Sequence, residues 1–199
     1  QLELFSPDYQ GPEVEARRTP ASRAVSLSGW SPHVAAVTNI TPNHLDRHPS
    51  MADYTRAKAN ILAYQSPADR AVLNADDPGS RALAGGAAGR VLWFSLEGGV
   101  EEGAFLRGEG LYLRRDLREE RLCGVDEVRL RGRHNLANVL AAACCAGAAG
   151  AGPEAMGAAV RAFGGVPHRL EVVRRVGGVT WVNDSIATSP ERAIAALRA

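Results

Sequence analysis

The chain contains a single lysine. It has 23 lysine and arginine residues, and all of them except Lys58 are arginine. Where a positive charge alone is needed, this sequence uses arginine, so Lys58 marks a position where a primary amine, which can be deprotonated or modified, serves a purpose that arginine cannot. The alternative is a lysine that extends to solvent from the edge of a core helix, or chance.

The chain also contains few cysteines and has a small net charge. The cysteines Cys123, Cys144 and Cys145 are odd in number and two are adjacent, which excludes a disulfide framework and a zinc-ligand spacing. We expect buried thiols in a reducing cytoplasm. A formal net charge of +1 gives no support for a nucleic-acid or membrane-surface partner. No apolar run approaches the ~20 residues that span a bilayer, and the N-terminus does not resemble a signal peptide.

Residues 34–62 contain the central features of the predicted site, in a strand, a loop and a helix. The apolar residues 34–37 predict a buried strand, and the polar loop 38–49 that follows contains His44, with Asp46 and His48 nearby. Ser50 and Asp53 form a start signal for a helix that we expect to reach about residue 65. The residues at three- and four-residue spacing then share one inward face, which is apolar except for the lysine: Met51, Tyr54, Lys58, Ile61 and Leu62.

The middle of the chain alternates strand and helix signals. Residues 70–73 and 90–96 predict buried strands, and short strands within 104–130, around Gly108-Glu109-Gly110, predict an antiparallel meander at one edge of the sheet. Helices are expected over 132–148 and 153–163. The polar residues 74–78 follow a strand, where α/β sheets place ligands; the alternative is an Asx turn before a helix.

Two asparagines open the helix expected over 132–148. Asn135 and Asn138 lie one turn apart at its start, where free backbone N–H groups and the helix dipole favour a polar or anionic ligand. The alternative is that Asn135 caps the helix, which explains one asparagine better than two.

The last part of the chain predicts the beginning of a second domain. Residues 166–169 indicate a hinge, residues 170–176 and 179–182 a hairpin around Gly177-Gly178, and residues 183–188 a polar loop before another helix. A hairpin and one helix cannot bury a core alone. We therefore expect one domain over 1–166 and a truncated second domain over 167–199. Residues 10–30 indicate a surface excursion without a functional explanation.

Five blocks, in the same order along the chain, make the sequence resemble the Mur ligase family of cell-wall peptide ligases. They are Thr38 to Arg47 (TNITPNHLDR), Tyr54 to Lys58 (YTRAK), Gly132 to Asn138 (GRHNLAN), His168 to Glu171 (HRLE) and Asn183 to Thr188 (NDSIAT). The resemblance implies an α/β fold with a mostly parallel sheet flanked by helices and an antiparallel edge, followed by the first strands of a Rossmann-like C-terminal domain.

The resemblance also implies an activity. Enzymes of this family use ATP to phosphorylate a substrate carboxylate, and the amino group of an amino acid attacks the acyl phosphate. The Asn183 to Thr188 block favours the branch that adds D-glutamate to UDP-N-acetylmuramoyl-L-alanine, and the family implies a cytoplasmic monomer when full length. The alternatives are another ligase of the family, folylpolyglutamate synthase, or a Mur-fold binding protein without catalysis.

The resemblance assigns roles to residues. It implies a carbamate, derived from CO₂, on Lys58, which with His44 would face Mg²⁺ and substrate. Asn135 and Asn138 match positions near the adenine of ATP. Within residues 169–188, Arg169 and Asp184 match positions at the nucleotide, and Ser185 and Thr188 match positions at the acceptor amino acid.

The sequence departs from the family pattern in two functional features. It contains no glycine-rich phosphate loop followed by lysine, so we expect the natural chain to start upstream and this stretch alone to lack ligase activity. Ile186 stands where many relatives carry lysine, which leaves open how the carboxylate of the acceptor is held.

Overall fold

A computed structural model of the 199-residue chain describes residues 29–41, 50–187 and 190–199. Most of the excursion at 10–30, together with His44 and Thr188, therefore lies outside the described residues. Within the described part, none of the helices has the length and apolar character that a membrane crossing requires.

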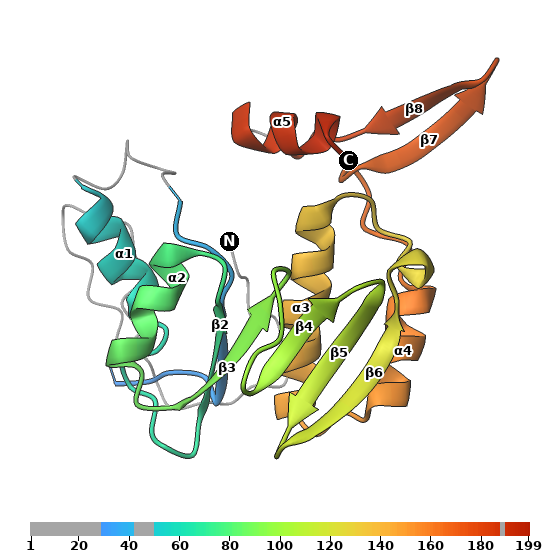
Figure 1. Cartoon of the computed structure of the whole chain (residues 1–199). Coiled ribbons are helices and arrows are strands. Elements are labelled where there is room, and N and C mark those ends of the chain that lie inside the picture. Colours follow the sequence, from blue (N-terminus) through green and yellow to red (C-terminus); the bar gives the residue numbers. More distant parts are fainter. Residues whose placement is uncertain (1–28, 42–49, 188–189) are drawn as a thin grey trace, which may run out of the picture.

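A single six-stranded sheet forms the centre of the molecule, and its strands follow one another in chain order (Figure 1). The first four strands pair in parallel, and the last three form an antiparallel meander, which confirms the predicted fold. The strands are β1 (Val34–Val37), β2 (Arg70–Asn74), β3 (Arg90–Ser95), β4 (Gly103–Arg107), β5 (Gly110–Arg115) and β6 (Arg118–Gly124).

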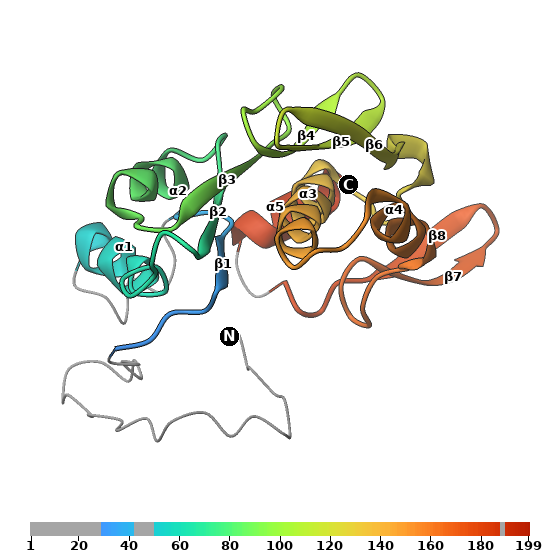
Figure 2. The ribbon, with the colours of Figure 1, turned by 90° about the horizontal axis from the view of Figure 1, so that it is seen from below.

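Helices cover both faces of the parallel part of the sheet. The short helices α1 (Met51–Ala59) and α2 (Pro78–Ala82) lie on one face, and α3 (Arg133–Ala148) lies on the other with α4 (Pro153–Ala162) beside it (Figure 2). The central strand β2 shows why both faces need a cover. Ala71 and Leu73 are buried on the α1 side, and Val72 is buried on the α3 side. Such a strand is apolar without interruption, as parallel sheets require.

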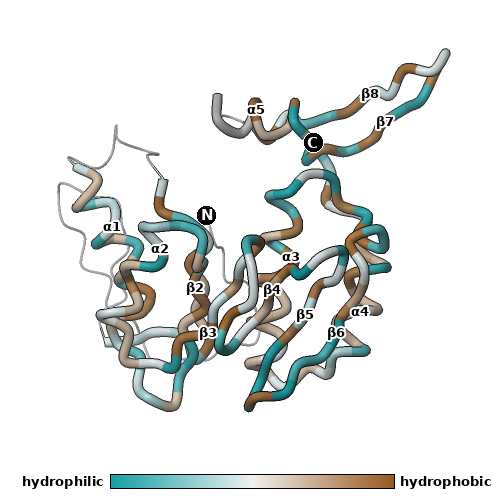
Figure 3. Tube along the Cα trace, in the orientation of Figure 1, coloured by the Kyte–Doolittle hydropathy of each residue, from teal (hydrophilic) through white to brown (hydrophobic). Residues whose placement is uncertain are grey.

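The larger core lies between α3, α4 and strands β2–β6. Its fully buried side chains include Phe94, Leu111, Leu113 and Leu140, and apolar residues concentrate along these elements (Figure 3). Burial of each such side chain contributes about 1.5–3 kcal/mol. The second core, under α1 and α2, is smaller. Two 3₁₀ turns, Leu83–Gly86 and Val125–Glu127, complete the connections.

Helix α1 begins as the sequence predicts and ends earlier. The Ser50 hydroxyl oxygen accepts a hydrogen bond from the Asp53 N–H (3.1 Å), so Ser50 is the N-cap. The helix stops at Ala59, and the expected extension to residue 65 is wrong. After Ala59 the backbone bonds run from residue i+3 to residue i, as in Leu62 N–H to Ala59 O (2.9 Å), so the chain continues as tight turns.

The outer face of the antiparallel meander has no helix over it among the described residues (Figure 2). Phe105 and Tyr112 stack there with ring centroids 5.7 Å apart, and the guanidinium of Arg107 lies 4.4 Å from the centre of the Tyr112 ring. Arg114 lies over Phe105, and Glu119 pairs with both arginines. The aliphatic parts of arginine side chains thus cover the aromatic rings where no helix does.

The C-terminal segment, residues 167–199, projects from this body at the end where α3 begins (Figure 1). It contains the hairpin of β7 (Glu171–Val176) and β8 (Val179–Asn183), confirming the predicted hairpin, and then α5 (Pro190–Leu197). The hairpin leaves large apolar side chains in solvent, with Val173 63% and Trp181 61% exposed.

Candidate functional site

The carboxyl ends of β1, β2 and β3 and the N-terminus of α3 meet at one edge of the sheet. Arg133, the first residue of α3, donates to the Glu97 carboxylate just after β3 (2.7 Å) and to the Leu96 carbonyl (3.4 Å). Open α/β sheets bind ligands at such an edge.

Polar side chains hold the loops after β1 and β2 together at this edge. The Asp77 carboxylate accepts hydrogen bonds from the N–H groups of Ser80 (2.6 Å) and Ile40 (3.1 Å), so it caps α2 and fixes the β1 loop. The Asn74 amide donates to the Thr38 carbonyl (2.9 Å). For residues 74–78, the structure therefore favours the Asx-turn alternative. The sequence pattern indicated a cap but could not show that its second partner would be Ile40.

Two further features make this edge rigid. The Asp76 carboxylate accepts from the Ser95 hydroxyl and the Leu96 N–H, both at 2.6 Å, which joins the ends of β2 and β3. Gly79 lies so close to the β1 loop that a Cβ there would stand 2.6 Å from the Ile40 Cβ. A side chain at position 79 would push the loop away from α2, so glycine is required by close approach.

Asn135 and Asn138 form a hydrogen-bonded pair on α3. Asn135 is 7% exposed; its amide donates to the Arg131 carbonyl (2.6 Å) and accepts from the Asn138 amide (3.1 Å). The helix cap is Gly132, at φ +88°, so the alternative in which Asn135 caps the helix is wrong. Asn135 orients Asn138, and the exposed Asn138 keeps an amide oxygen that can face a ligand.

The C-terminal segment approaches the same helix end. Burial, and secondarily the positive charge of Arg169, lower the pKa of His134, while the Asp184 carboxylate acts in the opposite direction. The charges of Arg169 and Asp184 thus act on the imidazole that precedes Asn135. Of the four predicted nucleotide-binding residues, the structure joins Asn135 and Asn138 directly, and the other two influence the neighbouring His134.

A network of short polar contacts holds the start of the C-terminal segment. His168 and Leu170 have positive φ angles of 67° and 49°, which is costly for residues other than glycine. The Leu170 N–H donates to the Asp184 carboxylate (3.0 Å), and the Asn183 amide lies 2.9 Å from His168 Nδ1. These contacts tie the beginning of β7 to the end of β8 and fix the backbone around Arg169.

The predicted acceptor residues lie just after β8. The Ser185 N–H donates to the Asn183 side-chain oxygen (3.1 Å), and both Ser185 and Ile186 are exposed. Thr188 belongs to the part that the structure does not describe, so the predicted pairing of Ser185 with Thr188 stays a prediction.

Lys58 differs from its expected environment. The prediction of a lysine on an inward face is wrong for this structure, because Lys58 is exposed and its Nζ lies 5.4 Å from the centre of the Tyr54 ring. Tyr54 and Leu62 occupy the small core, and the amine remains at its rim, over the ring face, where cation–π attraction holds it. A primary amine in this position is open to modification.

The metal site expected from Lys58 and His44 cannot be assembled from the described residues. Within residues 29–41, 50–187 and 190–199, no three histidine, cysteine, aspartate or glutamate side chains gather as ligands for a metal. An unmodified lysine is a cation and repels Mg²⁺, whereas a carbamate would supply the oxygen ligands that Mg²⁺ prefers. The cysteines are free thiols; Cys123 and Cys144 are buried, as expected, and Cys145 is partly buried.

Comparison with known proteins gives the family. Residues 13–146 match the family model "Mur ligase middle domain", and the chain belongs to the Mur ligase family. This confirms the resemblance that the five sequence blocks indicated.

Named relatives point to one branch of the family. The chain is 47% identical over 194 residues to a UDP-N-acetylmuramoylalanine–D-glutamate ligase from Symbiobacterium thermophilum, covering 93% of the chain and 43% of the relative. It is 40% identical over 197 residues to the enzyme of the same name from Pelotomaculum thermopropionicum, covering 99% of the chain and 42% of the relative. The chain thus spans less than half the length of these relatives.

Solved structures share the fold. MurF from Acinetobacter baumannii superposes with a TM-score of 0.66 at 23% identity, covering 84% of this chain and 37% of that one. MurF from Thermotoga maritima, solved in complex with ADP, gives a TM-score of 0.60 at 22% identity and covers 84% and 39%. A mutant of folylpolyglutamate synthase from L. casei gives 0.59 at 19% identity, with 90% and 44% covered.

Proposed function

We propose that this chain is the central part of a cytoplasmic, ATP-dependent ligase that joins D-glutamate to UDP-N-acetylmuramoyl-L-alanine. The observation that carries the proposal is the identity of 40–47% to relatives named for this reaction, over nearly the whole chain. The arrangement of side chains supports it, because the residues that match the family's nucleotide positions converge at the N-terminus of α3.

Each residue at the edge has a proposed part in the reaction. Asn138, oriented by Asn135, contacts the adenine of ATP. Arg169 and Asp184 reach the nucleotide from the C-terminal segment, and Ser185 and Thr188 hold the acceptor amino acid. The acceptor amine then attacks the acyl phosphate formed from the carboxylate of UDP-N-acetylmuramoyl-L-alanine, which yields an amide and releases phosphate.

Lys58 and His44 are proposed to serve the metal. A carbamate on the exposed amine of Lys58 converts a cation into an anion, which His44 would join in holding Mg²⁺. Bound Mg²⁺ would supply charge compensation as the γ-phosphate and the substrate carboxylate approach each other. The exposure of Lys58 supports access of CO₂ to the amine.

The domain boundary near residue 167 is part of the proposal. A hairpin with Val173 and Trp181 in solvent is not an independent folding unit. We infer that residues 167–199 begin a second domain, and that this domain presents Arg169 and Asp184 to the nucleotide. The full-length enzyme is proposed to act as a monomer.

The test is product formation by the full-length protein. The protein is incubated with ATP, Mg²⁺ and UDP-N-acetylmuramoyl-L-alanine, together with D-glutamate, L-glutamate, L-alanine or a diamino acid, and the products are identified by mass spectrometry. An amide product with D-glutamate alone is expected. A product with a different amino acid would assign another ligase of the family. No product from a folded protein that binds ATP would favour a binding protein of the same fold.

A substitution of Arg169 tests the proposed nucleotide contact. We expect Arg169→Ala to weaken ATP binding by about tenfold, as the loss of one charge-assisted hydrogen bond would, with little change in binding of the nucleotide-sugar substrate. Calorimetric titration of each ligand measures both effects. Equal weakening of the two ligands would contradict this placement, and Arg175→Ala, on exposed β7, is the matched control.

A further inference from the structure

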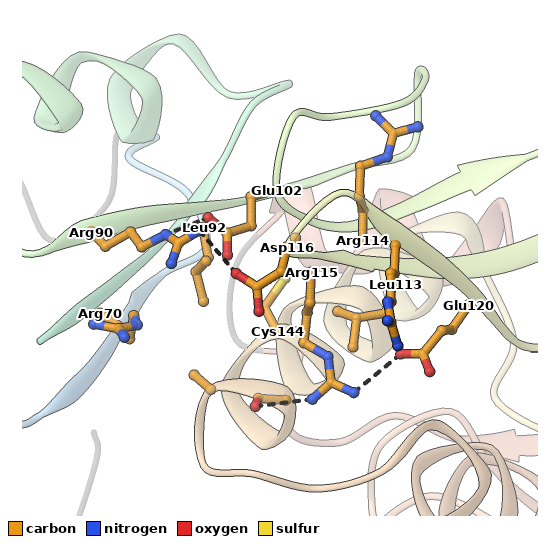
Figure 4. A pocket seen from close by; sticks show the side chains of 14 residues that line it. Arg70, Arg90, Leu92, Glu102, Leu113, Arg114, Arg115, Asp116, Glu120 and Cys144 are labelled. Carbon is orange, nitrogen blue, oxygen red and sulfur yellow. Dashed lines mark hydrogen bonds and ion pairs between the residues drawn. The ribbon is translucent and has the colours of Figure 1, made fainter.

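A hollow of about 650 Å³ lies at the end of the sheet away from the candidate nucleotide site (Figure 4). It is bordered by the first residues of β2 and β3, by the β5–β6 turn, and by Gly147 and Ala148 near the end of α3. Gly147 follows Asn135 by twelve positions on one helix, which places the hollow about 18 Å from the asparagine pair. The two sites are therefore separate.

Arginine side chains from four strands line this hollow, which we call the arginine pocket. They are Arg70 of β2, Arg90 of β3, Arg115 of β5 and Arg118 of β6, with Glu102, Asp116 and Glu120 among them. Arg114 also borders the pocket, but its side chain turns away toward the outer face of the meander, where it pairs with Glu119 (Figure 4).

Two of the four arginines already have carboxylate partners. Arg90 contacts Glu102 (2.6 Å) and Asp116 (3.6 Å). Arg115 pairs with Glu120 (3.1 Å) and also donates to the Ala151 carbonyl (3.2 Å), so it ties β5 to the end of α3. These two side chains have a structural function that explains their presence.

The other two arginines have no carboxylate partner among the described residues. Arg70 donates to the backbone carbonyls of Ala68 (2.6 Å) and Asp69 (3.0 Å) and forms no ion pair with another described residue. Arg118, exposed beside the turn, likewise forms no ion pair within the described part of the chain. The pocket therefore contains two guanidinium groups whose positive charge is not balanced by a carboxylate.

The turn at the rim of the pocket is strained. Asp116 and Leu117 both have positive φ angles, 47° and 67°, although neither is glycine, and Leu117 is 96% exposed. Glycine or asparagine would relieve this strain at a two-residue hairpin turn. Strained backbone gathers at functional sites, and this turn sets the positions of Arg115 and Arg118 on either side of it.

We propose that the arginine pocket binds a small oxyanion, a phosphate or carboxylate group, through Arg70 and Arg118. A guanidinium group presents paired N–H donors that match the oxygens of either group. Leu92, Leu113 and Cys144 also line the pocket, so part of its wall is apolar. The ligand is bound by a site that is independent of ATP.

The test measures binding of inorganic phosphate and of succinate to the full-length protein at constant ionic strength, with ADP saturating the nucleotide site. The wild type is compared with Arg70→Ser/Arg118→Ser, while Arg81→Ser, an exposed arginine on α2, is the matched control. Arg118→Lys keeps the charge without the paired donors. Thermal unfolding of each variant confirms that it is folded.

The expected result is saturable binding of one equivalent of phosphate, succinate or both. The double variant should weaken it at least about tenfold, Arg118→Lys should weaken it less, and Arg81→Ser should leave it unchanged. The preferred anion identifies the group that the pocket takes. The proposal is overturned if neither anion binds saturably, or if the folded double variant binds as the wild type does.

Discussion

The α/β body, residues 29–166, and the C-terminal segment, residues 167–199, use the same sequence of elements, a strand, a polar loop and a helix, with different results. The middle of β2 is completely buried between α1 and α3, whereas nearly all of β7 is exposed. Strands, turns and helices alone do not produce a hydrophobic core. A sheet needs a layer over its apolar face, and only the body supplies one within this chain.

Polar contacts also serve the two regions differently. In the body, Asp77 and Asp76 join loops that a buried sheet already holds in place. In the segment, the contacts among His168, Asn183 and Asp184 hold a hairpin that has little apolar support. Polar contacts in water contribute little net stability, so the proposed second domain would have to supply the apolar support that the segment lacks.

The largest expected effect is the difference in unfolding free energy between a variant of the body and a variant of the C-terminal segment. Leu140→Ala, in the middle of α3, removes a side chain with no exposed surface and should lower the free energy of unfolding by about 3 kcal/mol. Val173→Ala on β7 should change it by less than about 0.5 kcal/mol in the 199-residue chain, because Val173 is already in solvent.

Denaturant unfolding of both variants measures this difference. The same pair in the full-length protein makes the comparison sharper. If a second domain covers the hairpin, as proposed, Val173→Ala should cost about 1 kcal/mol or more there. An equally small effect in both proteins would contradict the proposal that a second domain covers the hairpin.

A stability effect of intermediate size is expected when a polar contact is removed from each of the two regions. Asp77→Ala removes the cap of α2 and leaves the Ile40 N–H without its partner, so we expect a loss of about 2 kcal/mol. Glu171→Ala removes one acceptor from the exposed His168 N–H, and we expect less than about 1 kcal/mol. Chemical denaturation of both variants tests this order, and a larger loss for Glu171→Ala would reverse the comparison.

The smallest effect concerns an exposed contact within the body. The Ser66 N–H, and then His33, lower the pKa of Asp69 from 3.8 to about 2. The folded pKa is the lower one, so the stabilisation is complete above the unfolded pKa of 3.8 and is lost as the pH falls through about 2. Asp69→Asn should flatten the stability profile in this interval. Parallel profiles for the wild type and the variant, from urea unfolding at each pH, would contradict the contribution of Asp69.

The sequence predicted the elements and their order because the local signals were strong. The apolar strand at 70–73, the Gly108-Glu109-Gly110 turn and the Gly177-Gly178 turn all form where expected. The predicted end of α1 was wrong: Ile61 and Leu62 continue the helical spacing, but the structure has turns after Ala59, with Leu62 in the small core.

Candidate site residues could be named from the sequence blocks, whereas the long-range contacts that surround them could not. Asn135 and Asn138 could be named from their spacing, but the hydrogen bond from the Ile40 N–H to the Asp77 carboxylate, between residues far apart in the sequence, could not. The arginine pocket was missed because its four arginines stand at the ends of separate strands. Because the chain has 23 lysine and arginine residues, none of these four arginines is distinctive by itself.

Phosphate release from ATP by the full-length protein, with and without Lys58→Arg, measures whether the ligase reaction depends on Lys58. Arginine keeps the charge and cannot carry a carbamate. With UDP-N-acetylmuramoyl-L-alanine, D-glutamate and Mg²⁺ present, we expect release by the wild type and nearly none by the folded variant. Wild-type turnover in Lys58→Arg would contradict the role of the only lysine in the chain, and no release by the folded wild type would contradict the ligase itself.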